Sequence, residues 1–362
     1  MSTTIARPEP ATALPPTQTR TLSTMTAQDR MVELGSWVSG FALAWLVNER
    51  LMAWTGPLAL VLTTVVASIL VLAVASAMTE PTPIVVDRVV AALVHVGALT
   101  VVIALLSTVV FILVRGLEAL PHLSLVTQDM SGVGPRDAFH RGGILHAVAG
   151  SLIQVGIAVV VTVPLGIGTA VFMTEVGGRY ARIVRTVVEA MTALPSIVAG
   201  LFIYTTLIVG LGVGRSGFAA AMALSVMMLP IIARAADVVL RVVPGGLREA
   251  SLALGASRWR TVWHVVLPTA RPGLATALIL GVARGIGETS PVLLTSGAAS
   301  FLVLDPTDGV MNSLPLFIYS TVRSGEPMYI ARAFAAATVL LFLVLALFAV
   351  ARYLARPRKG SR

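Results

Sequence analysis

The sequence predicts an all-α, polytopic membrane protein, and three observations support this fold class. Charged residues make up 12% of the 362 positions, whereas ordinary soluble domains have about 25%. Apolar types reach 56%, and uncharged apolar runs long enough to span a bilayer recur along the chain. The net charge of +9 comes from basic residues at the ends of those runs, which favours membrane orientation over nucleic-acid binding. Cysteine is absent, which excludes disulfides and thiolate metal sites.

The N-terminal quarter contains two predicted segments. Residues 1–32 are rich in Thr, Pro and Ala without an apolar core, so we predict a disordered cytoplasmic tail and no secretory signal peptide. Residues 33–88 form a hydrophobic extension with one long apolar run at 51–79. The shorter stretch that begins at Leu34 ends in Glu49-Arg50. It either spans, as the first arm of a hairpin that turns at Gly56-Pro57, or lies in the membrane interface.

Residues 89–356 are predicted to form one transmembrane domain. Each of its six apolar segments approaches or exceeds the roughly 20 residues that a helix needs to cross a bilayer. Pro164 and Pro195 fall within two of these segments, and we expect a kink or a break lining a pathway at each. The six segments are 89–114, 142–174, 190–214, 216–240, 272–297 and 333–355.

The orientation of these helices follows from the distribution of cations. One set of loops and ends carries thirteen basic residues, and the opposite loops carry six. Because basic residues remain on the cytoplasmic side, we predict that both ends of the domain are cytoplasmic, including a basic tail at 357–362. The thirteen are Arg179, Arg182, Arg185, Arg241, Arg248, Arg258, Arg260, Arg271, Arg352, Arg356, Arg358, Lys359 and Arg362. The six are Arg115, Arg136, Arg141, Arg215, Arg323 and Arg332.

The cytoplasmic loop 242–270 contains a spaced motif, Glu249-Ala250-Ser251, then Gly255, then Leu267-Pro268. We interpret it as a short helix, a glycine break and a second short helix stopped by proline. Small residues around Glu249 suit a helix that enters a groove on another protein. The second helix carries Trp and Arg on a face suited to the membrane surface. A pair of connector helices lying on the membrane is the alternative.

This loop resembles the EAA loop of ABC-importer permeases, which docks on a cytoplasmic ATPase and couples ATP hydrolysis to transport. Ser251 stands where the family usually has alanine, and Val265 where it usually has isoleucine. The resemblance implies a coupling role for a set of six residues. They are Glu249, Ala250, Ser251, Gly255, Leu267 and Pro268.

Four charges interrupt the apolar helices: Arg234 and Asp237 in one, Arg284 and Glu288 in another. Each costs about 2.5–3.5 kcal/mol at a helix centre on insertion scales, so such residues usually face the protein interior and serve a function. The i, i+3 and i, i+4 spacings place each pair on one helical face. Guanidinium groups that face a pathway would bind an oxyanion such as phosphate. The alternative is two buried ion pairs that only fix helix packing.

Three segments, 162–177, 191–204 and 283–295, together resemble the PstA-type permease of bacterial phosphate-specific importers. The resemblance implies a six-helix core of the type I importer class in the bacterial inner membrane, with Arg234, Asp237, Arg284 and Glu288 in the substrate pathway. The first 88 residues depart from that family.

The resemblance also implies a set of partner proteins. These are a second permease of the PstC type, two copies of a PstB-type ATPase and an extracytoplasmic phosphate-binding protein, all working at the lipid bilayer without nucleic acid. No Walker A sequence occurs, so we expect ATP and Mg²⁺ to bind the partner ATPase and this chain to hold no cofactor or metal. Sulfate or molybdate import stays open as an alternative. A membrane-embedded hydrolase is a further alternative, but the helices contain no H-E-x-x-H or G-x-S-x-G motif, and we predict no catalytic residue.

Overall fold

A computed structural model describes residues 27–52 and 56–354, and these are helical with connecting loops and contain no strand. The chain divides into two compact units, 1–107 and 108–362. The predicted tail at 357–362 and most of the predicted tail at 1–32 lie outside the described residues.

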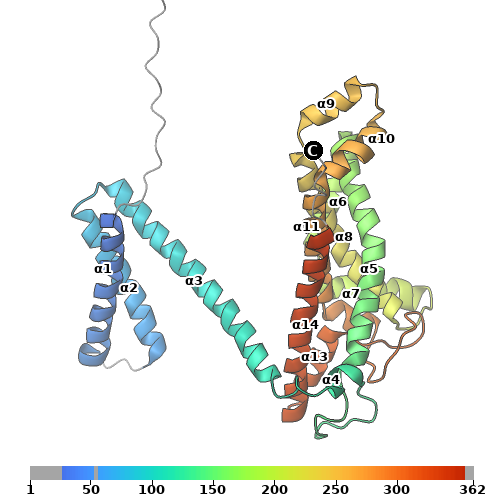
Figure 1. The fold of residues 1–362 in the computed structure, drawn as a ribbon, viewed down its shortest axis with the longest axis horizontal. Coiled ribbons are helices and arrows are strands. Elements are labelled where there is room, and N and C mark those ends of the chain that lie inside the picture. Colours follow the sequence, from blue (N-terminus) through green and yellow to red (C-terminus); the bar gives the residue numbers. More distant parts are fainter. Residues whose placement is uncertain (1–26, 53–55, 355–362) are drawn as a thin grey trace, which may run out of the picture. The chain divides into compact units, whose positions relative to one another are not determined.

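The first unit begins with a helical hairpin, drawn in blue in Figure 1. Helix α1 (Ala27–Leu46) continues through a π-helical turn, Val47–Leu51, and packs against α2 (Pro57–Ala77). The Asn48 side-chain amide donates to the Thr63 hydroxyl at 2.6 Å, and Gly40 lies against Ser68 with no room for a Cβ. Helices α1 and α2 therefore pack as a hairpin, and residues 53–55 between them lie outside the described residues.

Helix α1 starts earlier than the sequence predicts. Residues 27–32 are helical, so the predicted disordered tail was too long at its C-terminal end. Asp29 lies in the first turn, where a carboxylate is favourable beside the unpaired helix N–H groups. Asp29 also pairs with Arg88 of α3 (Thr82–Gly116). The composition of residues 1–32 could not predict this contact, because Arg88 is distant in the sequence.

Within the described residues, six helical stretches are long and apolar enough to cross a membrane, or up to seven if a bent pair counts as one span. Besides α2 and α3, a long span combines α5 (Leu145–Val171) with the π-helical turn Phe172–Val176. The others are α8 (Gly217–Val242), the continuous helix Arg258–Ile286 and α14 (Pro327–Leu354, apolar through Tyr353). Helix α1 is not among them. The predicted core of six spans therefore needs the bent pair.

A bent pair of helices covers most of the apolar segment predicted at 190–214. Helix α6 (Gly178–Thr192) and the stretch formed by α7 (Ser196–Ile203) and the π-helical turn Tyr204–Gly210 meet at 105°. Pro195 lies at the bend with extended backbone angles and has no N–H to continue the helix. The break expected at Pro195 is confirmed, whereas Pro164 lies inside α5, which continues beyond it.

The predicted span 272–297 ends early. The helix stops at Ile286, and residues 287–289 separate it from the short α12 (Ser290–Thr295). Gly287 at the helix end and Pro291 just beyond it both disfavour continuation. A non-helical segment then runs to α13 (Leu314–Val322).

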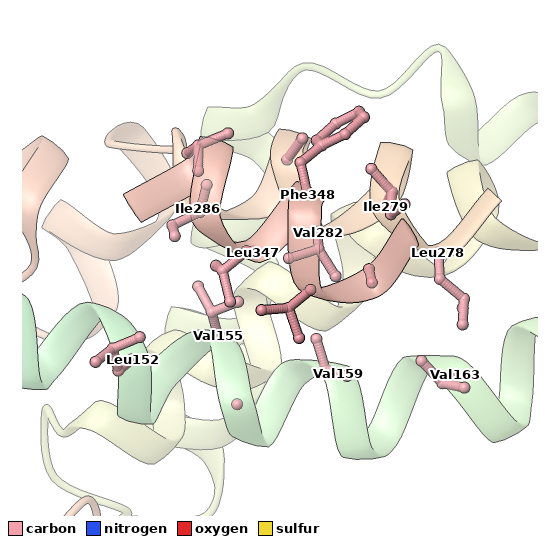
Figure 2. A pocket seen from close by; sticks show the side chains of 15 residues that line it. Leu152, Val155, Val159, Val163, Leu278, Ile279, Val282, Ile286, Leu347 and Phe348 are labelled. Atoms are coloured by element: carbon pink, nitrogen blue, oxygen red, sulfur yellow. The ribbon is translucent and has the colours of Figure 1, made fainter. Parts of the chain in front are cut away.

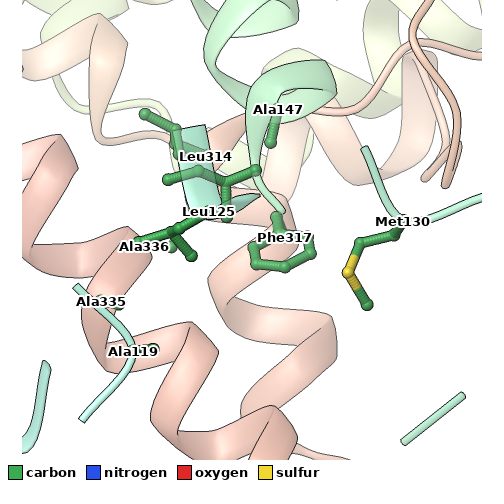
Figure 3. Packing of buried hydrophobic residues seen from close by; sticks show 9 residues of the cluster. Ala119, Leu125, Met130, Ala147, Leu314, Phe317, Ala335 and Ala336 are labelled. Atoms are coloured by element: carbon green, nitrogen blue, oxygen red, sulfur yellow. The ribbon is translucent and has the colours of Figure 1, made fainter. Parts of the chain in front are cut away.

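The core of the second unit is built from small residues on helices that are distant in sequence. Helices α5, α8 and α11 (Leu267–Ile286) approach closely, because Gly166 and Gly281 both lie against Ile232 and Gly285 lies against Met228. At one end, α4 (Ser124–Thr127), α5, α13 and α14 share an apolar cluster around Leu125, Leu314 and Phe317 (Figure 3). These clusters fix the ends of the helices that carry the candidate site.

Candidate functional site

The motif loop presents a short helix, α9 (Gly245–Ala253), with no buried residue. Its apolar side chains point outward: Leu247 is 42% exposed, Leu252 43%, and Leu254, just past the helix, 89%. Glu249 and Ala250 are exposed as well. A helix that leaves leucines uncovered in this way is suited to burial against another protein.

Gly255 ends α9 with a specific backbone turn. Its φ is +83°, a left-handed conformation that other L residues adopt at a cost. The Gly255 N–H donates to Leu252 O at 2.9 Å, and the Ala256 N–H donates to Ser251 O at 3.2 Å. These are the two hydrogen bonds of a Schellman motif, so the motif glycine has a structural role in setting the exit direction of the chain.

The second predicted short helix is wrong in its end point. Helix α10 (Arg258–Thr261) continues through the π-helical turn Val262–Val266 into α11, so the helix runs past Pro268. The wider π turn precedes Pro268 and lies where the proline ring would otherwise clash with a carbonyl. Leu267 packs partly buried against the core beneath the loop. Trp259 and Trp263 are 67% and 53% exposed and contact one another edge to face, which suits the membrane surface.

Two side chains attach α9 to the membrane helices. Arg248 pairs with Glu175, with Nη2 at 2.9 Å from the carboxylate, and donates to Leu240 O at 2.8 Å and Val243 O at 2.7 Å. The Ser251 hydroxyl hydrogen-bonds the Thr261 hydroxyl at 2.9 Å. The role of Arg248 was not predicted from the sequence, which indicated only a cytoplasmic cation. Glu175 at the end of an apolar run was the available signal.

Arg234 and Asp237 do not form the pair that their spacing suggested. Asp237 is 7% exposed and pairs with Arg185 of α6 at 3.4 Å and with Arg241 at 2.9 Å. Arg234 is exposed. Asp237 therefore ties α6 to α8, and its partner from α6 could not be read from the sequence of α8 alone.

Arg284 and Glu288 do form the predicted pair, at 2.9 Å. The Glu288 side chain is 9% exposed and lies just beyond the end of α11, whereas the Arg284 side chain is 57% exposed. A buried carboxylate held by a partly exposed guanidinium leaves donors on the outer side of the arginine for an approaching anion.

The two charged groups lie at different levels. Helices α8 and α11 are antiparallel, since Met228 meets Gly285 and Val239 meets Gly273. Arg284 is thus level with the residues after Met228, and Asp237 lies about 12 Å further along at 1.5 Å per residue. The Arg284–Glu288 pair and the group of Asp237 with Arg185 and Arg241 are therefore separate, and Arg234 pairs with neither.

A buried polar network supports the non-helical segment after α12. Gln154, 1% exposed in the middle of α5, donates to Met311 O at 3.2 Å and contacts the Ser296 hydroxyl at 3.4 Å. Asn312 donates to Ala299 O at 2.9 Å, and Leu314 N–H donates to the Ser151 hydroxyl at 2.7 Å. Non-helical backbone at membrane depth needs such internal partners. Gln154 was missed, although a glutamine inside an apolar run was a visible signal.

A cavity of about 350 Å³ lies between α5, α11 and α14. Figure 2 shows side chains from these helices around it, among them Val155, Val282 and Leu347. All the lining residues are apolar. The cavity offers an oxyanion no donor, so it is not the site of a charged solute.

The loops at the opposite end are held by charged groups. Arg332, 1% exposed, donates to the carbonyls of Asp137, Ala138 and Arg141 at 2.8–2.9 Å. The backbone N–H groups of Ser131 and Leu302 donate to the Asp129 carboxylate, and these bonds, the Ser131 bond above all, lower the pKa of Asp129. This end therefore presents an ordered surface.

This chain resembles known permeases over most of its second unit. Residues 162–359, more than half of the chain, match the family described as "Binding-protein-dependent transport system inner membrane component". The chain belongs to this family. It is 41% identical to phosphate transport system permease protein PstA 1 of Mycobacterium tuberculosis, over 64% of this chain and 76% of the relative. Identity to PstA of Mycobacterium leprae is also 41%, over 72% and 86% of the two chains, and to PstA of Pasteurella multocida it is 34%, over 67% and 84%. The chain is thus a multi-pass inner-membrane permease and a member of the PstA family.

Among solved structures, the inward-facing MetNI methionine ABC transporter is similar to 59% of this chain and 93% of its own, at 24% identity and a TM-score of 0.46. The fold class rests on the family match and on the helices described above.

Proposed function

We propose that this chain is the permease subunit of an ABC importer that moves inorganic phosphate into the cell. The observation that carries the proposal is the 41% identity to PstA permeases over most of their length. The Arg284–Glu288 pair supports it, since a partly exposed guanidinium beside a buried carboxylate is suited to transient contact with an oxyanion.

The proposal includes partners. Helix α9 would dock on a PstB-type ATPase present in two copies, which binds ATP and Mg²⁺, while this chain holds no cofactor. The exposed leucines of α9 support this docking. A PstC-type permease would supply the other wall of the pathway, and a phosphate-binding protein would deliver cargo at the outer loops. With α9 cytoplasmic, both ends of the permease core are cytoplasmic as well.

The test is uptake by the importer reconstituted in proteoliposomes from this chain and the other subunits of its own organism. We expect ATP-dependent accumulation of labelled phosphate, and no accumulation when ATP is omitted. Labelled sulfate and labelled molybdate serve as competing cargoes. Uptake of either one in place of phosphate would overturn the proposed cargo. ATP hydrolysis by the purified chain in the absence of the ATPase subunit would overturn the proposal that ATP binds the partner.

A further inference from the structure

Helix α9 is connected to α8 by a short segment that only partly fixes its direction. Only Val243 and Pro244 separate the two helices, and α9 opens with Gly245-Gly246, which have no side chains and wide backbone freedom. None of the α9 residues is buried. The orientation of α9 therefore depends on the side-chain attachments at Arg248 and Ser251 as well as on the turn at Gly255.

Arg248 joins α9 to two membrane helices at once. The carbonyls of Leu240 and Val243 lie at the C-terminal end of α8, where no further turn of helix supplies donors, and the Arg248 guanidinium donates to both. Its Nε donates to Glu175 at 3.0 Å, at the end of the span that contains α5. The Arg248 and Glu175 side chains are 23% and 17% exposed, so the pair is partly shielded from water and its charge-assisted bonds are stronger than those of a surface pair.

Ser251 attaches the other half of α9 to the next helix. Its hydroxyl bonds to Thr261, which is 3% exposed at the start of the helix Arg258–Ile286. Helix α9 is thus held on one side by α5 and α8 and on the other by α10 and α11. Of the two attachments, the ionic one at Arg248 has more hydrogen bonds and directional geometry.

We propose that Arg248 is a positioning residue that transmits displacements of α9 to α5 and α8 through Glu175 and the last carbonyls of α8. This rests on the proposed function, in which α9 is the part that the ATPase moves. Helices α5 and α8 pack along their length, and α8 carries Asp237 three residues before Leu240. A guanidinium with a fork of donors fixes both the distance and the angle of α9. Without it, α9 would swing about Gly245-Gly246 while the membrane helices stayed in place.

The first test compares uptake with ATP hydrolysis in the same proteoliposomes. In Arg248→Gln and in Glu175→Gln, hydrolysis continues because the exposed docking face is unchanged, and phosphate moved per ATP falls at least about fivefold, the lower end of typical coupling between sites. Arg248→Lys keeps the charge but loses the planar fork, so it recovers only part of the ratio. Arg179→Gln, an exposed cation on α6, is the matched control with a normal ratio. A normal ratio in Arg248→Gln, or an equal loss in Arg179→Gln, overturns the proposal.

The second test is independent of transport. The chain has no cysteine, so a spin label at Leu254→Cys reports on the end of α9 alone in the purified full-length chain. We expect greater label mobility with Arg248→Gln or Glu175→Gln than with the native residues, and no change with Arg179→Gln. Unchanged label mobility in both test variants would overturn the positioning role of Arg248, even where uptake is lost. If the native importer moves no phosphate while the label responds as expected, the proposed function fails, whereas the positioning role of Arg248 and Glu175 is retained.

Discussion

At the scale of the single residue, the structure explains two positions of the motif, Gly255 and Ser251. Gly255 is required for its left-handed backbone, since a Cβ there would meet open space and no neighbour. Ser251 departs from the usual alanine of the family and uses its hydroxyl to bond Thr261. The motif therefore encodes the shape of the loop as well as its docking face.

Gly255→Val should weaken the turn by about 1–2 kcal/mol, because a β-branched residue is strained at positive φ. We expect normal membrane insertion, reduced association with the ATPase and reduced phosphate uptake. Gly255→Asn is the control, since asparagine tolerates this conformation, and it should retain most uptake. Association and uptake are measured by co-purification and in proteoliposomes. Equal behaviour of the two variants would refute the backbone explanation.

Removing either charge of Arg284 and Glu288 tests whether they belong to the pathway. Arg284→Gln and Glu288→Gln should each reduce phosphate uptake by at least about tenfold, the effect of losing one charged hydrogen bond of roughly 1.5 kcal/mol or more. The complex should still assemble, as measured by co-purification of the subunits.

The double variant Arg284→Met with Glu288→Leu separates a pathway role from a packing role. It removes both charges and retains apolar volume, so a purely structural pair should tolerate it. We expect an assembled and inactive importer. An assembled importer with normal uptake would make the two residues packing residues.

At the scale of the element, the end of α11 is the part of the fold that departs most from a simple span. The helix stops at Ile286, and the chain returns through α12 and a non-helical segment before α13. The contacts of Gln154 and Ser151 with residues 296–314 supply hydrogen bonds that this backbone lacks within itself. Helix α5 thus stabilises a segment that is distant in the chain, since Gln154 and Met311 are 157 residues apart.

Gln154→Met keeps the side-chain length and removes the amide donors, so the Met311 carbonyl loses the Gln154 bond and keeps only the Ser296 hydroxyl as a donor, at a cost of about 0.5–1.5 kcal/mol. We expect faster hydrogen exchange at residues 296–313 and a lower melting temperature of the purified chain. Exchange at α9 serves as the internal control and should not change. Unaltered exchange at 296–313 would show that the network does not hold this segment.

At the scale of the whole molecule, the orientation in the membrane is open to direct test. Position 308 is exposed in the loop before α13, whereas position 258 lies in the predicted cytoplasmic loop. With Asp308→Cys, an impermeant thiol reagent should label intact spheroplasts, and with Arg258→Cys it should label only after the membrane is opened. Val160→Cys, in the apolar span that contains α5 and with 74% exposure, is the unlabelled control. Labelling of position 258 from outside would reverse the predicted topology.

The sequence by itself determined the class of the protein and most of its helices. Long apolar runs have one stable solution in a bilayer, because every backbone N–H and C=O must be paired within the segment, so α3, α5, α8 and α14 could be predicted from composition alone. Spacing along one helix also sufficed for the Arg284–Glu288 pair and for the Glu249 and Gly255 motif, since both depend on residues within one or two turns.

The tertiary structure decided whatever depends on contacts between segments distant in the chain. Arg185 replaced Arg234 as a partner of Asp237, Arg248 bound Glu175 across 73 residues, and Gln154 bonded a loop beyond α12. It also decided that the helix continues past Pro268, because packing against α8 and the π-helical turn outweighs the local preference of proline. A charge or an amide in an apolar run signals that a partner is needed, and only the packed helices determine which residue that partner is.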